Sequence, residues 1–214
     1  MDQSIRAKKI YRVTLAGGII NALLVTLKFI AGIAGHSAAM VADAVHSLSD
    51  FITDVTVLLF VKLSNRPKDK KYDYGYGKYE TVATALIGLA LLAVGVIILR
   101  DGIVRIVRAM RGDEPPAPSM IAFWMAIASI VAKEICYRFT IRVGRKVDSQ
   151  AVIANAWHHR SDAFSSVGTA LGIGGAIMLG DKWRVLDPIA AAVVSFFIIK
   201  IAIDVLRESF GELT

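Results

Sequence analysis

A nine-residue phrase that contains histidine and aspartate occurs twice in this chain. Residues 42–50 read ADAVHSLSD, and residues 154–162 read ANAWHHRSD. Each copy has a histidine four residues before an aspartate, so both side chains share one face of a helix. Two such faces turned toward each other offer two imidazoles and two carboxylates, a donor set that suits a divalent metal. The predicted ligands are His46, Asp50, His158 and Asp162.

The same four residues have a competing interpretation as polar contacts between helices. One buried histidine or aspartate in a membrane helix is often structural, but two pairs at one spacing in a repeated phrase favour metal binding. Three nearby polar residues are candidate accessory groups that guide the ion or orient its ligands, with interhelical hydrogen bonding as the alternative: Asp43, Asp54 and Asn155.

The phrases must be positioned by membrane helices. The chain is 55% hydrophobic, its mean hydropathy is +0.56, and its apolar runs are about 20 residues long, enough to cross a bilayer as helix. The formal charge of +7 comes from basic residues at helix ends and in loops, which favours membrane orientation over nucleic-acid binding. One cysteine excludes a disulfide within the chain.

Six spans are expected in a single transmembrane domain covering residues 1–214. Their ranges are 11–34, 37–63, 79–99, 119–137, 148–179 and 187–206. The third is expected to extend as an amphipathic helix to Met110, and three prolines then mark a loop. A basic connection, residues 138–146, is expected between the fourth and fifth spans. Lys28 and Lys200 lie within expected membrane spans, so each needs a carboxylate partner or must extend its side chain to the membrane–water interface.

The distribution of basic residues predicts that both termini are cytoplasmic. With that orientation 16 basic residues lie inside: Arg6, Lys8, Lys9, Arg12, Lys62, Arg66, Lys68, Lys70, Lys71, Lys78, Lys133, Arg138, Arg142, Arg145, Lys146 and Arg207. Six lie outside: Arg100, Arg105, Arg108, Arg111, Lys182 and Arg184. The two phrase-bearing spans then run in opposite directions, so the chain is expected to be a 3+3 inverted repeat with its site near the midplane, as in secondary transporters.

With these motifs the chain resembles the cation diffusion facilitator family over nearly its whole length. The resemblance rests on the six spans, on residues 46–50 and 158–162, and on the GYGKYE segment at residues 75–80. It implies export of a divalent transition metal, usually zinc, in exchange for protons, by a homodimer. It places the transport site on the quartet named above, whose two histidines and two aspartates resemble zinc-type members.

Two departures from the family pattern are visible. A second metal site in the loop after the second span, made of one aspartate and two histidines in some members, corresponds here to Asp69, Tyr72 and Tyr76. That site is expected to be absent or weak, although Asp69 and Asp73 can attract cations. The usual cytoplasmic C-terminal domain is expected to be missing, because the sequence stops at Thr214 after the sixth span.

The predicted function is therefore zinc efflux by a metal/proton antiporter in the cell (inner) membrane, with no cofactor and no enzymatic activity. Iron, manganese, cobalt, nickel and cadmium accept the same donors and remain alternative cargoes. A cation channel or metal sensor is the alternative function. A membrane-embedded metalloenzyme is the weaker rival, because no HExxH motif or separate general base is visible.

Overall fold

The computed structural model describes residues 3–64 and 77–213, and its regular elements in these ranges are all helical. The six α-helices are α1 (Gln3–Ala34), α2 (Ala38–Ser64), α3 (Gly77–Met110), α4 (Met120–Lys146), α5 (Gln150–Met178) and α6 (Leu186–Leu213). A 3-10 turn, Asp181–Trp183, precedes α6. The prediction of an all-α fold built on six long helices is confirmed for the described residues.

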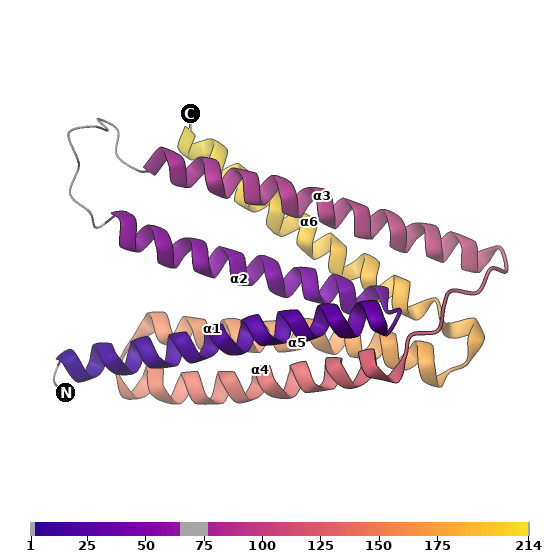
Figure 1. Cartoon of the computed structure of the whole chain (residues 1–214), viewed down its shortest axis with the longest axis horizontal. Coiled ribbons are helices and arrows are strands. Elements are labelled where there is room, and N and C mark those ends of the chain that lie inside the picture. Colours follow the sequence, from indigo (N-terminus) through magenta and orange to yellow (C-terminus); the bar gives the residue numbers. More distant parts are fainter. Residues whose placement is uncertain (1–2, 65–76, 214) are drawn as a thin grey trace.

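The helices run in alternating directions along one long bundle (Figure 1). α4 packs closely on α5, and α3 packs closely on α6. α2 contacts both α1 and α6, so it joins the α3–α6 pair to the other helices. α1 begins and α6 ends at the same end of the bundle, and α2 and α5 are antiparallel (Figure 1).

Two helices end well beyond their apolar runs. α4 continues to Lys146, so the basic stretch at residues 138–146, which follows the expected fourth span, is part of this helix. α6 continues to Leu213, beyond the expected end near residue 206. Hydropathy marks the stretch that suits an apolar layer, whereas a helix can continue past it with polar side chains. The ion pair of Arg138 with Glu134 one turn earlier, 2.8 Å between Nε and Oε1, supports that continuation.

The expected breaks between helices are present. α1 ends in a turn at His36, whose φ of 54° is in the left-handed region. The Gly35 carbonyl there accepts a hydrogen bond from the Ser119 amide at 2.8 Å, which fixes the start of α4 beside this turn. Residues 111–119, which contain the three prolines, are not helical, as predicted.

Small residues allow the central helices to pack closely. One core cluster contains four alanines from α1, α2 and α4 and a fifth, Ala170, from α5. A Cβ on Gly32 of α1 would lie 2.9 Å from the backbone nitrogen of Val41 in α2, so only glycine permits this approach. Such small-residue contacts are typical of helices packed in a membrane, where no hydrophobic force drives helices together.

The distribution of side chains also fits a lipid environment. Large apolar residues such as Ile19, Leu86 and Phe196 are more than half exposed, while Lys28 and Lys133 are almost completely buried. Among the described residues, four segments are long and apolar enough to cross a membrane: Lys9–Ala34, Thr84–Met110, Met120–Lys146 and Asp181–Gly211. They fall on α1, α3, α4 and α6. The repeated phrases lie on the other two long helices, α2 and α5.

Candidate metal site

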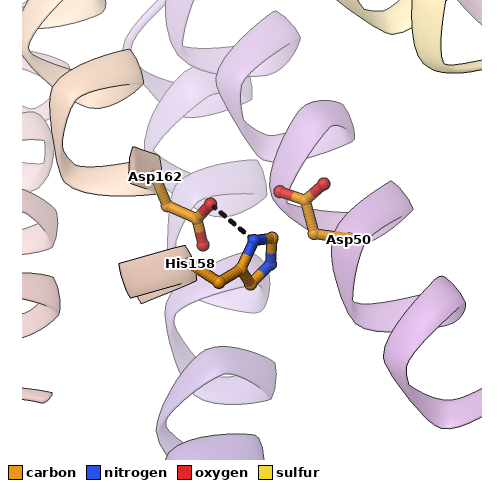
Figure 2. A group of neighbouring side chains, drawn as sticks. All are labelled: Asp50, His158 and Asp162. Carbon is orange, nitrogen blue, oxygen red and sulfur yellow. Dashed lines mark ion pairs between the residues drawn. The ribbon is translucent and has the colours of Figure 1, made fainter. Parts of the chain in front are cut away.

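The two copies of the repeated phrase lie on α2 and α5, and their histidine–aspartate faces meet inside the bundle. Asp50 of α2 and His158 and Asp162 of α5 each offer one ligand atom, and these three atoms lie within 4.8 Å of one another (Figure 2). All three are predicted ligands from the sequence. The tertiary structure therefore brings together one aspartate from the first phrase and the histidine–aspartate pair of the second.

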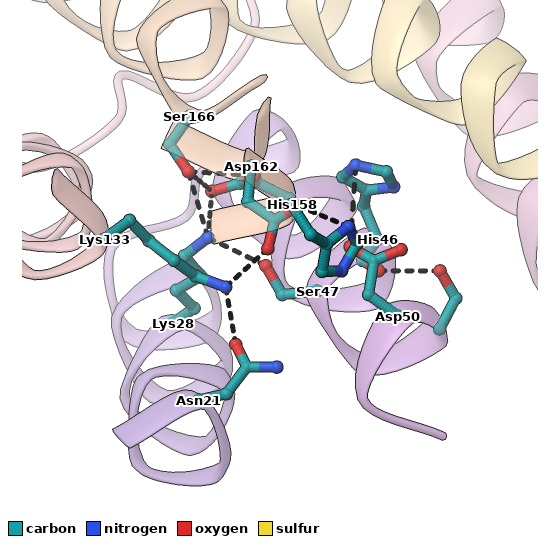
Figure 3. Close-up of polar contacts among 11 residues, drawn as sticks. Asn21, Lys28, His46, Ser47, Asp50, Lys133, His158, Asp162 and Ser166 are labelled. Carbon is teal, nitrogen blue, oxygen red and sulfur yellow. Dashed lines mark hydrogen bonds and ion pairs between the residues drawn. The ribbon is translucent and has the colours of Figure 1, made fainter. Parts of the chain in front are cut away.

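His46, the fourth predicted ligand, joins this group through Asp50. Its Nε2 lies 3.8 Å from Asp50 Oδ2. The second phrase repeats that distance through the other ring nitrogen, with 3.8 Å between His158 Nδ1 and Asp162 Oδ1. Each pair has the four-residue spacing that puts two side chains on one helix face. The quartet is thus two equivalent pairs that face each other across the α2–α5 contact (Figure 3).

The donor atoms of the quartet suit a metal ion. His46 Nδ1 and His158 Nε2 are buried and have no hydrogen-bond partner among the described residues. A buried nitrogen without a partner costs about 1–3 kcal/mol, a cost that coordination to a cation would remove. Bonds of about 2.0 Å to a tetrahedral zinc place ligand atoms roughly 3.3 Å apart. Asp50, His158 and Asp162 would therefore have to move closer together to bind such an ion.

Lys133 of α4 contacts the site from the side opposite His158. Its Nζ donates hydrogen bonds to Asp162 Oδ2 and to Asn21 Oδ1 of α1, both at 2.6 Å (Figure 3). The two oxygens of Asp162 thus have different partners: Oδ1 faces His158, and Oδ2 pairs with Lys133. Lys133, which the sequence analysis counted among the cytoplasmic basic residues, is instead buried in the middle of α4.

Lys28 of α1 forms a second buried cluster with the first phrase. Its Nζ lies 2.7 Å from Asp43 Oδ2 and donates hydrogen bonds to Ser47 Oγ at 2.9 Å and Ser166 Oγ at 3.1 Å. Ser166 Oγ also donates to Asp43 Oδ2 at 3.1 Å. These contacts connect α1, α2 and α5. They identify the carboxylate partner that Lys28 was expected to need.

The other candidate accessory residues are placed as follows. Asp43 is held by Lys28 and is not one of the three grouped ligands. Asn155 is half-buried on α5, and Lys200 is exposed on α6. Asp54 belongs to α2, but its side chain lies outside the described residues, as do Asp69, Tyr72, Asp73 and Tyr76 of the following loop.

Sequence reasoning missed Lys133 and Asn21 as neighbours of the site. Lys133 was counted among the cytoplasmic basic residues, and Asn21 carried no signal of its own. An ionisable residue that follows an apolar run starting at Met120 was the available indication for Lys133, since such residues in a membrane helix usually face partners in the bundle. No spacing rule connects α1, α4 and α5, so the sequence offered no way to pair these side chains.

A helical bundle with apolar outer surfaces and a buried histidine–aspartate site is typical of a membrane protein that handles metal ions. A family model described as the cation efflux transmembrane domain matches residues 14–214. The chain therefore belongs to the cation efflux family, also called cation diffusion facilitators, which comprises transporters rather than enzymes. This confirms the family resemblance inferred from the motifs.

Three proteins that are similar in sequence to this chain carry different names. The chain is 36% identical over 206 residues to the manganese efflux system protein MneP of Bacillus subtilis (strain 168), covering 94% of this chain and 68% of that protein. It is 35% identical to magnetosome protein MamB of Magnetospira sp. (strain QH-2), covering 91% and 64%. It is 36% identical to metal tolerance protein C1 of Arabidopsis thaliana, covering 96% and 45%. The chain thus spans two thirds or less of the length of most of these relatives.

Proposed function

We propose that this protein exports a divalent transition metal, with zinc as its main cargo, through a site formed by His46, Asp50, His158 and Asp162. The observation that supports it most is the convergence of Asp50, His158 and Asp162 inside an apolar bundle, with His46 beside Asp50. Two imidazoles and two carboxylates suit a four-coordinate zinc ion. Membership in the cation efflux family supports transport as the outcome of binding.

In the proposed topology all six helices cross the cell (inner) membrane as a 3+3 inverted repeat with both termini in the cytoplasm. Two features support this topology: the helices alternate in direction, and the start of α1 and the end of α6 lie at the same end of the bundle (Figure 1). The excess of basic residues in the loops and tails assigned to that end supports the cytoplasmic orientation. Inverted halves can rock about a fixed midplane site, which gives alternating access.

Exchange for protons is the proposed energy source. Metal ligands must be deprotonated to bind, so protons and metal compete for the same lone pairs of His46 and His158. Protonation on the outer side would release the metal, and the protonated site would then return inward. The working unit is proposed to be a homodimer, as the family resemblance implies.

The first experiment measures metal flux into proteoliposomes under an imposed pH gradient. Asp50→Ala and His158→Ala should each abolish saturable zinc uptake and its coupled proton movement. His36→Asn, which changes an exposed histidine in the α1–α2 turn and tolerates the left-handed backbone there, should keep both. Normal transport by the two site variants would exclude the quartet as the transport site. Uptake that does not saturate and moves no protons would instead indicate a channel.

Manganese is the alternative cargo, because MneP is named as a manganese efflux system protein. Manganese prefers oxygen ligands, whereas imidazole suits zinc. Zinc and manganese uptake by the wild type should therefore be compared with uptake by His46→Asp, which replaces one nitrogen donor with oxygen. The proposal expects the wild type to prefer zinc and the variant to shift toward manganese. A wild-type preference for manganese would overturn the zinc assignment without affecting the site.

A further inference from the structure

We propose that Lys133 sets the metal affinity of the quartet: its ammonium group competes with the metal for Asp162 and keeps binding weak enough for release. This inference rests on the proposed function of the same site. Lys133 is a positioning residue, since it acts through Asp162 and is not itself a ligand. Its geometry, its fixed placement and its contrast with Lys28 support this role.

The two oxygens of the Asp162 carboxylate face different groups. Asp162 Oδ2 pairs with Lys133 Nζ at 2.6 Å, while Asp162 Oδ1 faces His158 and the shared site. With neutral histidines, the charge of the quartet comes from Asp50 and Asp162. Lys133 offsets one of these two negative charges. A divalent ion therefore enters a site of lower negative charge, beside a positive charge that repels it.

Lys133 is held where it cannot leave Asp162 easily. Its side chain is 2% exposed, so the ammonium has no route to water in this conformation. Asn21 Oδ1 of α1 accepts a second hydrogen bond from Nζ at 2.6 Å and fixes its position. Because the ion pair is buried, its electrostatic effect is screened far less than that of a surface pair. In this conformation the ammonium therefore acts strongly on the charge of Asp162.

The first half of the chain lacks an equivalent lysine at this position. Asn21 precedes its copy of the phrase by the same number of residues as Lys133 precedes the second copy. Lys28 is also buried, but it pairs with Asp43, which is not among the grouped ligand atoms. Of these two buried lysines, Lys133 thus pairs with a quartet aspartate and Lys28 does not. This asymmetry indicates a role at the site beyond packing.

A weakened site is useful to a transporter. Conduction through a binding site requires that binding is favourable enough for entry and weak enough for exit. Two buried carboxylates and two imidazoles without an opposing charge would hold zinc tightly. Lys133 lowers that affinity without removing a donor, because Asp162 keeps Oδ1 directed toward the ligand group.

The test is zinc titration of the purified full chain by calorimetry at one fixed pH. Lys133→Met should bind zinc at least about tenfold more tightly than the wild type, because a nearby positive charge is removed. Lys133→Arg keeps the charge and should bind within about threefold of the wild type. Lys28→Met is the comparison variant, since it removes the other buried lysine, and it should tighten binding less than Lys133→Met does, because its partner Asp43 is not one of the grouped ligands. In proteoliposomes, Lys133→Met should lower both KM and kcat, whereas a purely structural role would not lower KM.

A second variant covers the case in which Lys133→Met does not fold. Asn21→Asp is nearly isosteric and offers Lys133 another carboxylate, so it should also tighten zinc binding by drawing the ammonium from Asp162. Unchanged or weaker zinc binding by folded Lys133→Met or Asn21→Asp, or equal tightening by Lys28→Met, would overturn the inference. If zinc binding by the wild type survives in His158→Ala and Asp50→Ala, the quartet proposal itself fails. These two failures are therefore distinguishable.

Discussion

Two buried lysines of this bundle make similar contacts in different surroundings. Lys28 of α1 pairs with Asp43 of the first phrase and donates to two serines on α2 and α5. Lys133 of α4 pairs with Asp162 of the second phrase and donates to Asn21 of α1. Both ammonium groups are shielded from solvent, and both connect helices from the two halves of the chain (Figure 3).

The difference between the clusters lies in the aspartate that each lysine holds. Asp43 has its negative charge compensated within its own cluster and contributes to helix packing. Asp162 keeps one oxygen toward the candidate metal site, so its pairing with Lys133 affects both the bundle and the ligand set. A buried ion pair by itself is weak evidence for function. Its position relative to the donor atoms is what distinguishes these two pairs.

The largest expected difference between the two clusters is in zinc affinity when the charge of Asp162 or of Asp43 is removed. Asp162→Asn should weaken zinc binding by about 100-fold or more, because it replaces a charged ligand with a neutral amide, while Asp43→Asn should change it by less than about tenfold. Calorimetric titration of the two folded variants measures both. Equal losses would mean that Asp43 also belongs to the metal site and that the two clusters are one.

The next contrast concerns stability in the Lys28 cluster. Lys28→Met should lower the free energy of unfolding by about 3–5 kcal/mol, since it leaves Asp43 buried without its cation. Adding Asp43→Leu should recover most of that loss, because an apolar pair can replace a buried ion pair at little cost. Denaturant unfolding in detergent completes this double-mutant cycle. If the single effects simply add, the 2.7 Å pair is not energetically coupled.

The smallest expected contrast compares two buried serines. Ser166→Ala removes a hydroxyl that accepts from Lys28 and donates to Asp43, and should cost about 1–2 kcal/mol. Ser129→Ala removes a buried hydroxyl with no hydrogen-bond partner among the described residues, and should change stability by less than about 0.5 kcal/mol. The same unfolding assay measures both variants. A larger loss for Ser129→Ala would show that the Lys28 cluster contributes little to stability.

Much of the fold was predictable because long apolar runs in the sequence identify membrane helices. The six helices, the turn at His36 and the proline-containing segment follow from that pattern and from local chain stereochemistry. The end of α4 was not predictable in this way, because its last residues are polar and still helical. Apolar runs report the solvent around a helix, and helix ends depend on local contacts as well.

The candidate ligands were also predictable, because the repeated phrase places each histidine and its aspartate on one helix face. In the structure Asp50 lies close to His158 and Asp162, and His46 lies beside Asp50. Their transport role stays a prediction until the variants are measured. The proposed loop residues Asp69 and Asp73 and the side chain of Asp54 lie outside the described part of the chain.

By itself, the sequence determined the helical membrane character, the family and the two histidine–aspartate pairs. These features depend on hydropathy and on spacing within one helix, which neighbouring residues define. The tertiary structure decided that Lys28 belongs to Asp43 and Lys133 to Asp162. Those partners come from different helices, and their contacts depend on how the helices are rotated and packed, which no spacing along the chain encodes.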